Sequence, residues 1–165
     1  MFQEGQLVFY GIHGVCRLLA PEIRRIDRKD VEYLVVSPVS RPDARFYVPA
    51  HNEIALSKLL PLLTKEELDA LLASCREGED PWIPEDNRRK LHYKELIAKG
   101  DRESIIRMIR SLRYHKNAQL ASGRKFHVSD EGFLRDAEHL LSEEFSIVLN
   151  ISPQEVSTYI ENALK

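Results

Sequence analysis

Short hydrophobic stretches separated by polar and turn-forming residues occupy much of the first sixty positions, and this pattern predicts β-strands. The stretches concerned are rich in β-branched and aromatic residues and cover residues 6–12, 14–20, 31–37 and 44–50. Gly14 suits a tight turn between the first two stretches, and the polar residues 25–30 connect the second to the third. Short strands spaced by turns predict a small antiparallel barrel or a strongly bent sheet.

The period changes to that of α-helices after residue 60. Thr64 followed by Glu67 is a capping box, and it begins a helix that runs to about Ser74. Four further helices are expected over residues 86–99, from 102 to near 123, from 129 to the late 140s, and from 153 onwards. The predicted fold class is therefore α+β, with a β domain over residues 1–60 and an all-α domain of about five helices over residues 61–165.

The composition is that of a globular chain, with 43% hydrophobic and 30% charged residues among 165. No apolar stretch is long enough to span a bilayer, and the first residues lack the pattern of a secretory signal. We therefore expect a cytoplasmic, monomeric protein without membrane contact. Cys16 and Cys75 lie in apolar surroundings, which favours two buried free thiols over a disulfide or a metal site.

The charge is distributed unevenly along the chain. Residues 88–125 hold 12 Lys or Arg against 3 Asp or Glu, a net charge of +9, although the whole chain carries −2. Such a basic block is typical of a segment with a polyanionic partner. A solvated helix face that pairs with the chain's own acids explains the block equally well, so both readings stay open.

Candidate catalytic chemistry is absent from the sequence. There is no phosphate-binding glycine loop, nucleophile elbow or zinc-protease motif, and the six histidines do not cluster at ligand spacing. We predict a non-enzymatic binding or regulatory protein with no metal and no cofactor.

One segment, "GEDPWIPEDNRR", contains the chain's single tryptophan, Trp82. Two prolines and several acids surround it, and Arg88, Arg89 and Lys90 follow. These neighbours form turns and carry charge, which predicts a surface position rather than a core position. The alternative is that Trp82 packs the linker onto the helical domain.

Several motifs in the same order resemble the CarD/CdnL family of bacterial transcription factors. They are "GQLVFYGIHGVCRL", "FYVPAHN", the tryptophan with the Arg-Arg pair, "KELIAKGD", "IIRMIRSLRYH" and "FLRDAEHLLSEEFS". The similarity spans essentially the whole chain. It implies a Tudor-like (SH3-like) N-terminal domain that binds the β subunit of RNA polymerase. The transcription-repair coupling factor shares this domain type.

The resemblance also implies particular site residues. It places polymerase contacts at Arg24 and Ile26, which alternate onto one strand face. Tyr47 stands where family members can have a polymerase-contacting arginine, and Arg45 lies two residues earlier on the same face.

In the helical domain, the resemblance implies contact with promoter DNA at the upstream edge of the transcription bubble. Trp82 would act as a minor-groove wedge, and Arg88, Arg89 and Lys90 would hold phosphates. The protein would stabilise the open complex and would associate with the nucleoid through the polymerase. The alternative function is a protein–protein adaptor with a Tudor-like domain and no direct DNA contact.

Overall fold

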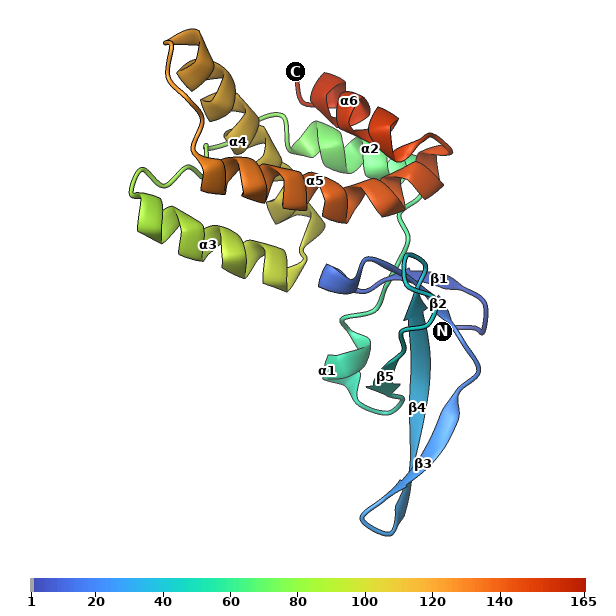
Figure 1. The fold of residues 1–165 in the computed structure, drawn as a ribbon. Helices are drawn as coiled ribbons and strands as arrows, with labels where there is room; N and C mark the ends of the chain where they lie inside the picture. Colours follow the sequence, from blue (N-terminus) through green and yellow to red (C-terminus); the bar gives the residue numbers. More distant parts are fainter. Residues whose placement is uncertain (1) are drawn as a thin grey trace. The chain divides into compact units, whose positions relative to one another are not determined.

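The computed structural model describes residues 2–165, which form two compact units that meet in sequence between Leu62 and Leu63. The elements of the N-terminal unit are β1 (Leu7–Phe9), a 3-10 turn (Gly11–His13), β2 (Val15–Leu18), β3 (Glu22–Ile26), β4 (Lys29–Pro38), β5 (Phe46–Pro49), α1 (Glu53–Leu56) and β6 (Leu60–Pro61). The elements of the helical unit are α2 (Lys65–Ser74), α3 (Asp86–Lys99), α4 (Arg102–Ala121), α5 (Val128–Leu149) and α6 (Pro153–Ala163) (Figure 1). The α+β fold class predicted from the sequence is confirmed.

Strand β4 is the centre of a six-stranded antiparallel sheet with the order β3-β4-β2-β1-β6, and β5 also pairs with β4. Both β2 and β3 pair with one edge of β4, because they form one strand interrupted by a bulge. From Leu18 to Glu22 the chain advances four residues, while the partners on β4 move only three, from Val36 to Tyr33. The extra residue bends the strand, as bulges do, and β5 takes the opposite edge of β4.

The β3–β4 hairpin is tighter than the sequence predicts. Ile26 pairs with Lys29, so only Asp27 and Arg28 form the turn, with φ of 49° and 64°. Two consecutive positive φ values are typical of the two-residue turn that matches the twist of a hairpin. The prediction of a polar connection over residues 25–30 is therefore wrong at both of its ends, which belong to strands.

The histidine of the "GIHG" turn has a structural role. The His13 ring lies 4.0 Å from the Phe46 ring and 5.0 Å from the Tyr10 ring, between centroids. Burial, followed by the charge of Arg41, lowers the pKa of His13 below its ordinary value. A neutral ring in aromatic surroundings fixes the turn against β5, next to a core that includes Val8, Cys16 and Val36.

The helical unit begins and ends its helices largely as predicted. The capping box predicted at Thr64 forms, a second one forms at Ser152, and Gly100 ends α3 in the left-handed conformation. Helix α5 packs against α2, α3, α4 and α6 and is therefore the centre of the unit (Figure 1). Cys75 lies in this core and Cys16 in the other, and both are buried and outside a disulfide. No helix within residues 2–165 is long and apolar enough to cross a membrane.

Candidate functional site

One face of the β3–β4–β5 sheet gathers three of the predicted polymerase-binding residues. Arg24 lies opposite Val31, and Tyr47 lies opposite Val35, so both side chains point to the same face of β4. The guanidinium carbon of Arg24 is 3.9 Å from the centroid of the Tyr47 ring. Ile26 shares the face and is 44% exposed. We call Arg24, Ile26, Tyr33 and Tyr47 the β3 face.

The β3 face borders an open strand edge. In the hairpin, Glu22, Arg24 and Ile26 turn their backbone groups toward β4, so those of Ile23 and Arg25 point outward. No strand within residues 2–165 pairs with that outer edge. Arg45, just before β5, is exposed. An open edge flanked by arginines and an exposed isoleucine is suited to pairing with a strand of another protein.

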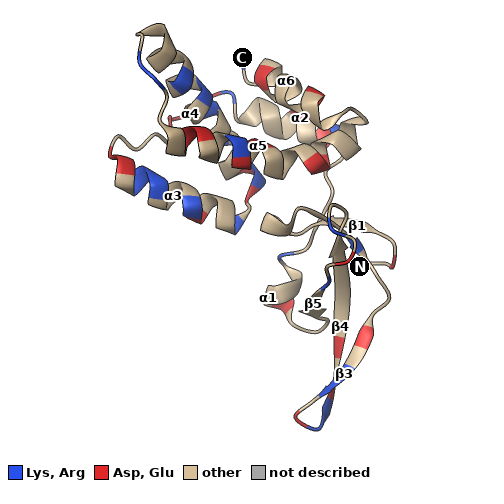
Figure 2. Cartoon of the chain, in the orientation of Figure 1, with Lys and Arg blue, Asp and Glu red and all other residues tan. Residues whose placement is uncertain are grey.

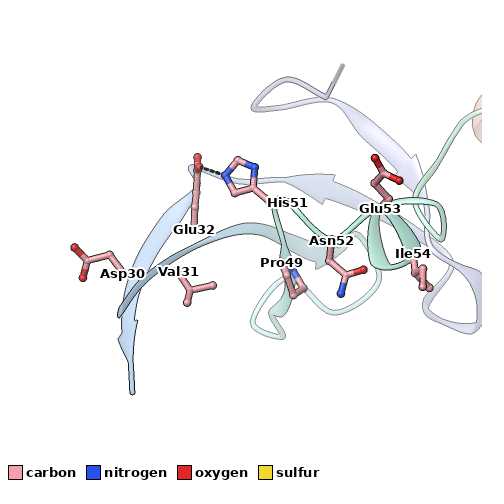
Figure 3. Close-up of a pocket in the computed structure, with 8 residues that line it drawn as sticks. All are labelled: Asp30, Val31, Glu32, Pro49, His51, Asn52, Glu53 and Ile54. Atoms are coloured by element: carbon pink, nitrogen blue, oxygen red, sulfur yellow. Dashed lines mark hydrogen bonds and ion pairs between the residues drawn. The ribbon is translucent and has the colours of Figure 1, made fainter. Parts of the chain in front are cut away.

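The opposite edge of the hairpin has a different chemistry. A hollow of about 600 Å³ lies there, lined by Asp30, Val31, Glu32, Pro49, His51, Asn52, Glu53 and Ile54. Figure 3 shows Glu32 turned toward His51, and their ion-pair distance is 3.2 Å. The lining has three carboxylates and no lysine or arginine, so this hollow is unsuited to nucleic acid.

Trp82 is covered on both faces of its ring. The His115 imidazole stacks on the indole at 3.8 Å between centroids and 14° between planes. The guanidinium carbon of Arg89 lies 4.1 Å from the ring centroid. The imidazole and the guanidinium must lie on opposite faces of the indole, because two groups this close to the ring centroid would overlap if they shared a face. The ring is partly buried against the helical core, so the expectation of an exposed Trp82 is wrong.

Asp80 fixes the His115 side of this stack. Its carboxylate accepts hydrogen bonds from the Ser111 hydroxyl and from the Trp82 backbone N–H, and it pairs with His115 Nε2 at 2.7 Å. Partial burial raises the pKa of Asp80, but the hydrogen bonds from Ser111 and His115 outweigh it, so the pKa lies below its ordinary value. The ionised form is the one that the folded chain stabilises.

Arg89 fixes the other side of the stack from the interior. Its side chain is 3% exposed and forms two hydrogen bonds with the Asp130 carboxylate, at 3.0 and 2.7 Å. It also pairs with Asp86 at 2.8 Å and donates to the Ile83 carbonyl at 2.9 Å. The expectation that Arg89 holds DNA phosphates conflicts with this burial, because its guanidinium is enclosed and already paired with Asp130 and Asp86.

Much of the basic block is neutralised internally. Five of its 12 cations form ion pairs with acidic side chains, namely Arg89, Arg102, Arg107, Arg113 and Lys116. Figure 2 shows basic positions along α3 and α4 and acidic ones on α5. Arg88 and Lys94 are exposed on α3 and Lys90 is half-buried; none of the three has an ion pair within residues 2–165. Two of the three predicted phosphate-binding cations therefore remain available.

We expect the stability of the helical unit to fall below about pH 4, in part through Asp80. A carboxylate whose pKa is lowered by folding contributes stability above its unfolded value, about 3.9, and that stability is lost as the pH falls through the folded value. Asp80→Asn should flatten the acid slope when the free energy of unfolding is measured from neutral pH down to about pH 3. Glu79→Gln, at the exposed neighbouring position, is the control. An unchanged slope in Asp80→Asn would contradict this role.

No local sequence signal identifies His115, which stacks on Trp82, or Asp130, which holds Arg89 against the ring. His115 and Asp130 lie 33 and 48 residues from Trp82 along the chain, on α4 and α5. Asp130 lies in the first turn of α5. The helix dipole favours a carboxylate at such a position, so the sequence suggests no further role for it. Only the packing of α3 against α5 identifies it as the partner of Arg89.

A comparison with protein-family models matches residues 2–60 to the family described as CarD-like/TRCF RID domain. RID denotes an RNA polymerase-interacting domain, so the N-terminal unit has a transcription-associated, protein-binding role. The matched residues contain the whole β3 face and its open edge. Residues 2–60, which make up most of the N-terminal unit, match the CarD-like/TRCF RID domain, and this match is consistent with the resemblance to the CarD/CdnL family seen in the sequence.

Proposed function

We propose that this protein is a non-enzymatic transcription regulator that binds the RNA polymerase β subunit and stabilises the promoter open complex. The β3 face and the open edge of β3 bind the β subunit, and the helical unit contacts promoter DNA at the upstream edge of the bubble. The observation that carries the proposal is the RID match, together with the clustering of Arg24, Ile26 and Tyr47 on one exposed face.

The polymerase contact combines backbone pairing with side-chain recognition. The outward N–H and C=O groups of Ile23 and Arg25 accept a strand from the partner, and the Arg24 guanidinium is held over Tyr47 at 3.9 Å. Arg45 adds a second exposed positive charge. Preorganising Arg24 on an aromatic ring lowers the entropy lost on binding.

The test of this proposal is co-purification with RNA polymerase from the native cell, followed by binding to the isolated β subunit. The β subunit should be retained by the chain, and a DNA-independent complex should survive nuclease treatment. Failure to bind any polymerase subunit would refute the proposal.

The DNA contact is electrostatic and uses Arg88, Lys90 and Lys94. We expect the DNA affinity of the full chain to decrease with salt with a log–log slope of about −2.7, or roughly 40-fold between about 50 and 200 mM, if these three cations each meet one phosphate. Arg88→Ala should reduce the slope by about 1. Lys58→Ala, at an exposed lysine of the other unit, is the matched control. A salt-independent affinity would contradict phosphate contact.

Trp82 acts as a wedge only after its ring leaves the stack. Separating it from His115 and Arg89 costs about 1–3 kcal/mol if aromatic stacking and cation–π contacts are taken together. Stacking on an unpaired base returns about 1–3 kcal/mol. The cost of leaving the stack and the gain from stacking on a base are nearly equal. We therefore propose that Trp82 inserts only where the polymerase has already unstacked the DNA.

Trp82→Ala is therefore expected to change two measurements. Loss of the stack should lower the free energy of unfolding by about 1–3 kcal/mol, and loss of the wedge should shorten the lifetime of the open complex, tenfold for about each 1.4 kcal/mol. Leu91→Ala, at a residue 60% exposed on α3, should change stability by less than about 0.5 kcal/mol. If the folded variant supports a normal open-complex lifetime, Trp82 is a packing residue only.

The alternative function is a protein–protein adaptor without direct DNA contact. The internal pairing of five cations favours it, because those residues have no charge left for phosphates. An adaptor binds the polymerase normally but shows neither the salt slope nor the effect of Trp82→Ala on open complexes. The same two measurements therefore separate the two functions.

A further inference from the structure

A groove of about 950 Å³ lies within the helical unit, between α4, α5 and α6. Helix α4 contributes Arg110, Arg113, Tyr114 and Asn117, which recur at the i, i+3, i+4 and i+7 spacing of one helix face. The groove lies beside the start of the loop that carries Trp82, because Asp80 and Pro81 line its rim. Its volume falls in the range of small-molecule sites, about 300–1,000 Å³.

The charges that line the groove are not balanced. Two cations are compensated, since Arg113 pairs with Glu138 at 2.7 Å and Lys116 pairs with Glu131 at 2.9 Å. Asp80, a further acid of the lining, contacts His115 and accepts a hydrogen bond from Ser111, and its carboxylate keeps its negative charge.

The remaining cations lack partners. Arg110, Arg135 and Lys165 have no ion pair within residues 2–165, and two acids of the lining, Asp80 and Glu161, are left to oppose them. With five cations and four acids, the side chains that line the groove carry a net charge of +1.

Two further features indicate the chemistry of an occupant. The Nη1 nitrogen of Arg113, in the groove wall, is buried and has no hydrogen-bond acceptor in the described part of the chain. Such a donor costs about 1–3 kcal/mol if it stays unpaired. Next to it, the Tyr114 ring is 66% exposed and offers a flat aromatic surface.

We propose that this groove binds a phosphate-bearing nucleotide. Arg110, Arg135 and Lys165 hold the phosphates, as guanidinium and ammonium groups do, and Tyr114 stacks on the base. An acidic partner helix fits less well, because it would need a continuous apolar stripe. The apolar part of the lining is limited to Pro81, Tyr114, Leu134 and Leu164.

The test is a titration of the full chain with ATP, followed by calorimetry and by amide chemical shifts, without polymerase or DNA. Arg110→Glu and Arg135→Glu should each weaken binding by at least about tenfold, and Tyr114→Ala should weaken it less. Arg76→Glu reverses an exposed arginine outside the groove and should leave the affinity unchanged. Because neither polymerase nor DNA is present, the result is independent of the proposed transcriptional role.

Three results would overturn the proposal. They are no binding of ATP by the folded chain, equal weakening by Arg76→Glu and the groove variants, and binding of an acidic helical peptide in place of ATP. Retained helical circular dichroism in each variant excludes unfolding as the cause of a lost affinity. Rescue of binding by Arg110→Lys, which keeps the charge, would support direct phosphate contact.

Discussion

Asp130→Asn is expected to lower the free energy of unfolding of the helical unit by about 3–5 kcal/mol, because it leaves the Arg89 charge buried without its main partner. Asp130 is 1% exposed and Arg89 is 3% exposed, so water cannot replace the lost carboxylate. For a unit of this size the melting temperature should fall by more than about 10 °C. Thermal and denaturant unfolding, followed by helical circular dichroism, measures the change.

The matched control is Asp136→Asn on the same helix. Asp136 is exposed and has no ion pair in the described chain, so the same chemical change should cost less than about 0.5 kcal/mol. A double variant, Arg89→Met with Asp130→Leu, should recover much of the stability, since apolar replacement of a buried pair is often near neutral. Equal costs for the two single substitutions would show that the pair does not stabilise the fold.

The second large effect is expected on polymerase binding. Arg24→Glu should weaken binding to the β subunit by at least about 30-fold, or about 2 kcal/mol, since it removes a positive charge from the proposed interface and introduces a negative one. The fold should persist, because Arg24 is exposed and its ion pair with Glu22, at 3.3 Å, lies on the surface. A binding titration with the isolated β subunit gives the affinity.

Arg25→Glu provides the control for Arg24→Glu. The two residues are adjacent on β3 but point to opposite faces of the sheet, and Arg25 pairs with Asp30 away from the β3 face. Arg25→Glu should therefore reduce affinity much less than Arg24→Glu, although the net charge changes equally. Equal losses would indicate a nonspecific charge effect, and undiminished binding by Arg24→Glu would move the interface elsewhere on the domain.

The helices were predictable because their signals are local. Thr64, Asp101 and Ser152 each cap a helix with their own side chain, and Gly100 ends one with a positive φ. Each of these devices acts within three or four residues of itself, so the sequence contains all the information that is needed.

The β3–β4 hairpin was harder to predict, because the two isoleucines of β3 point to opposite faces and give no apolar side. Strand β3 reads "EIRRI" and is exposed along most of its length, so it lacks the apolar alternation from which strands are inferred. Its two-residue turn places Asp27 and Arg28 in a conformation that glycine and asparagine favour more strongly. Pairing with the long strand β4, rather than local preference, makes these residues a strand.

By itself, the sequence determined the α+β class, the helix boundaries, the burial of both cysteines and the resemblance that the RID match supports. Only the tertiary structure decided which charges remain free for a partner. Arg88 and Arg89 are neighbours in the same motif, yet one faces solvent and the other is enclosed by Asp130 and the Trp82 ring. The reason is physical: the helical period separates adjacent side chains by about 100°, and the packing of α3 against α5 determines which of the two is buried.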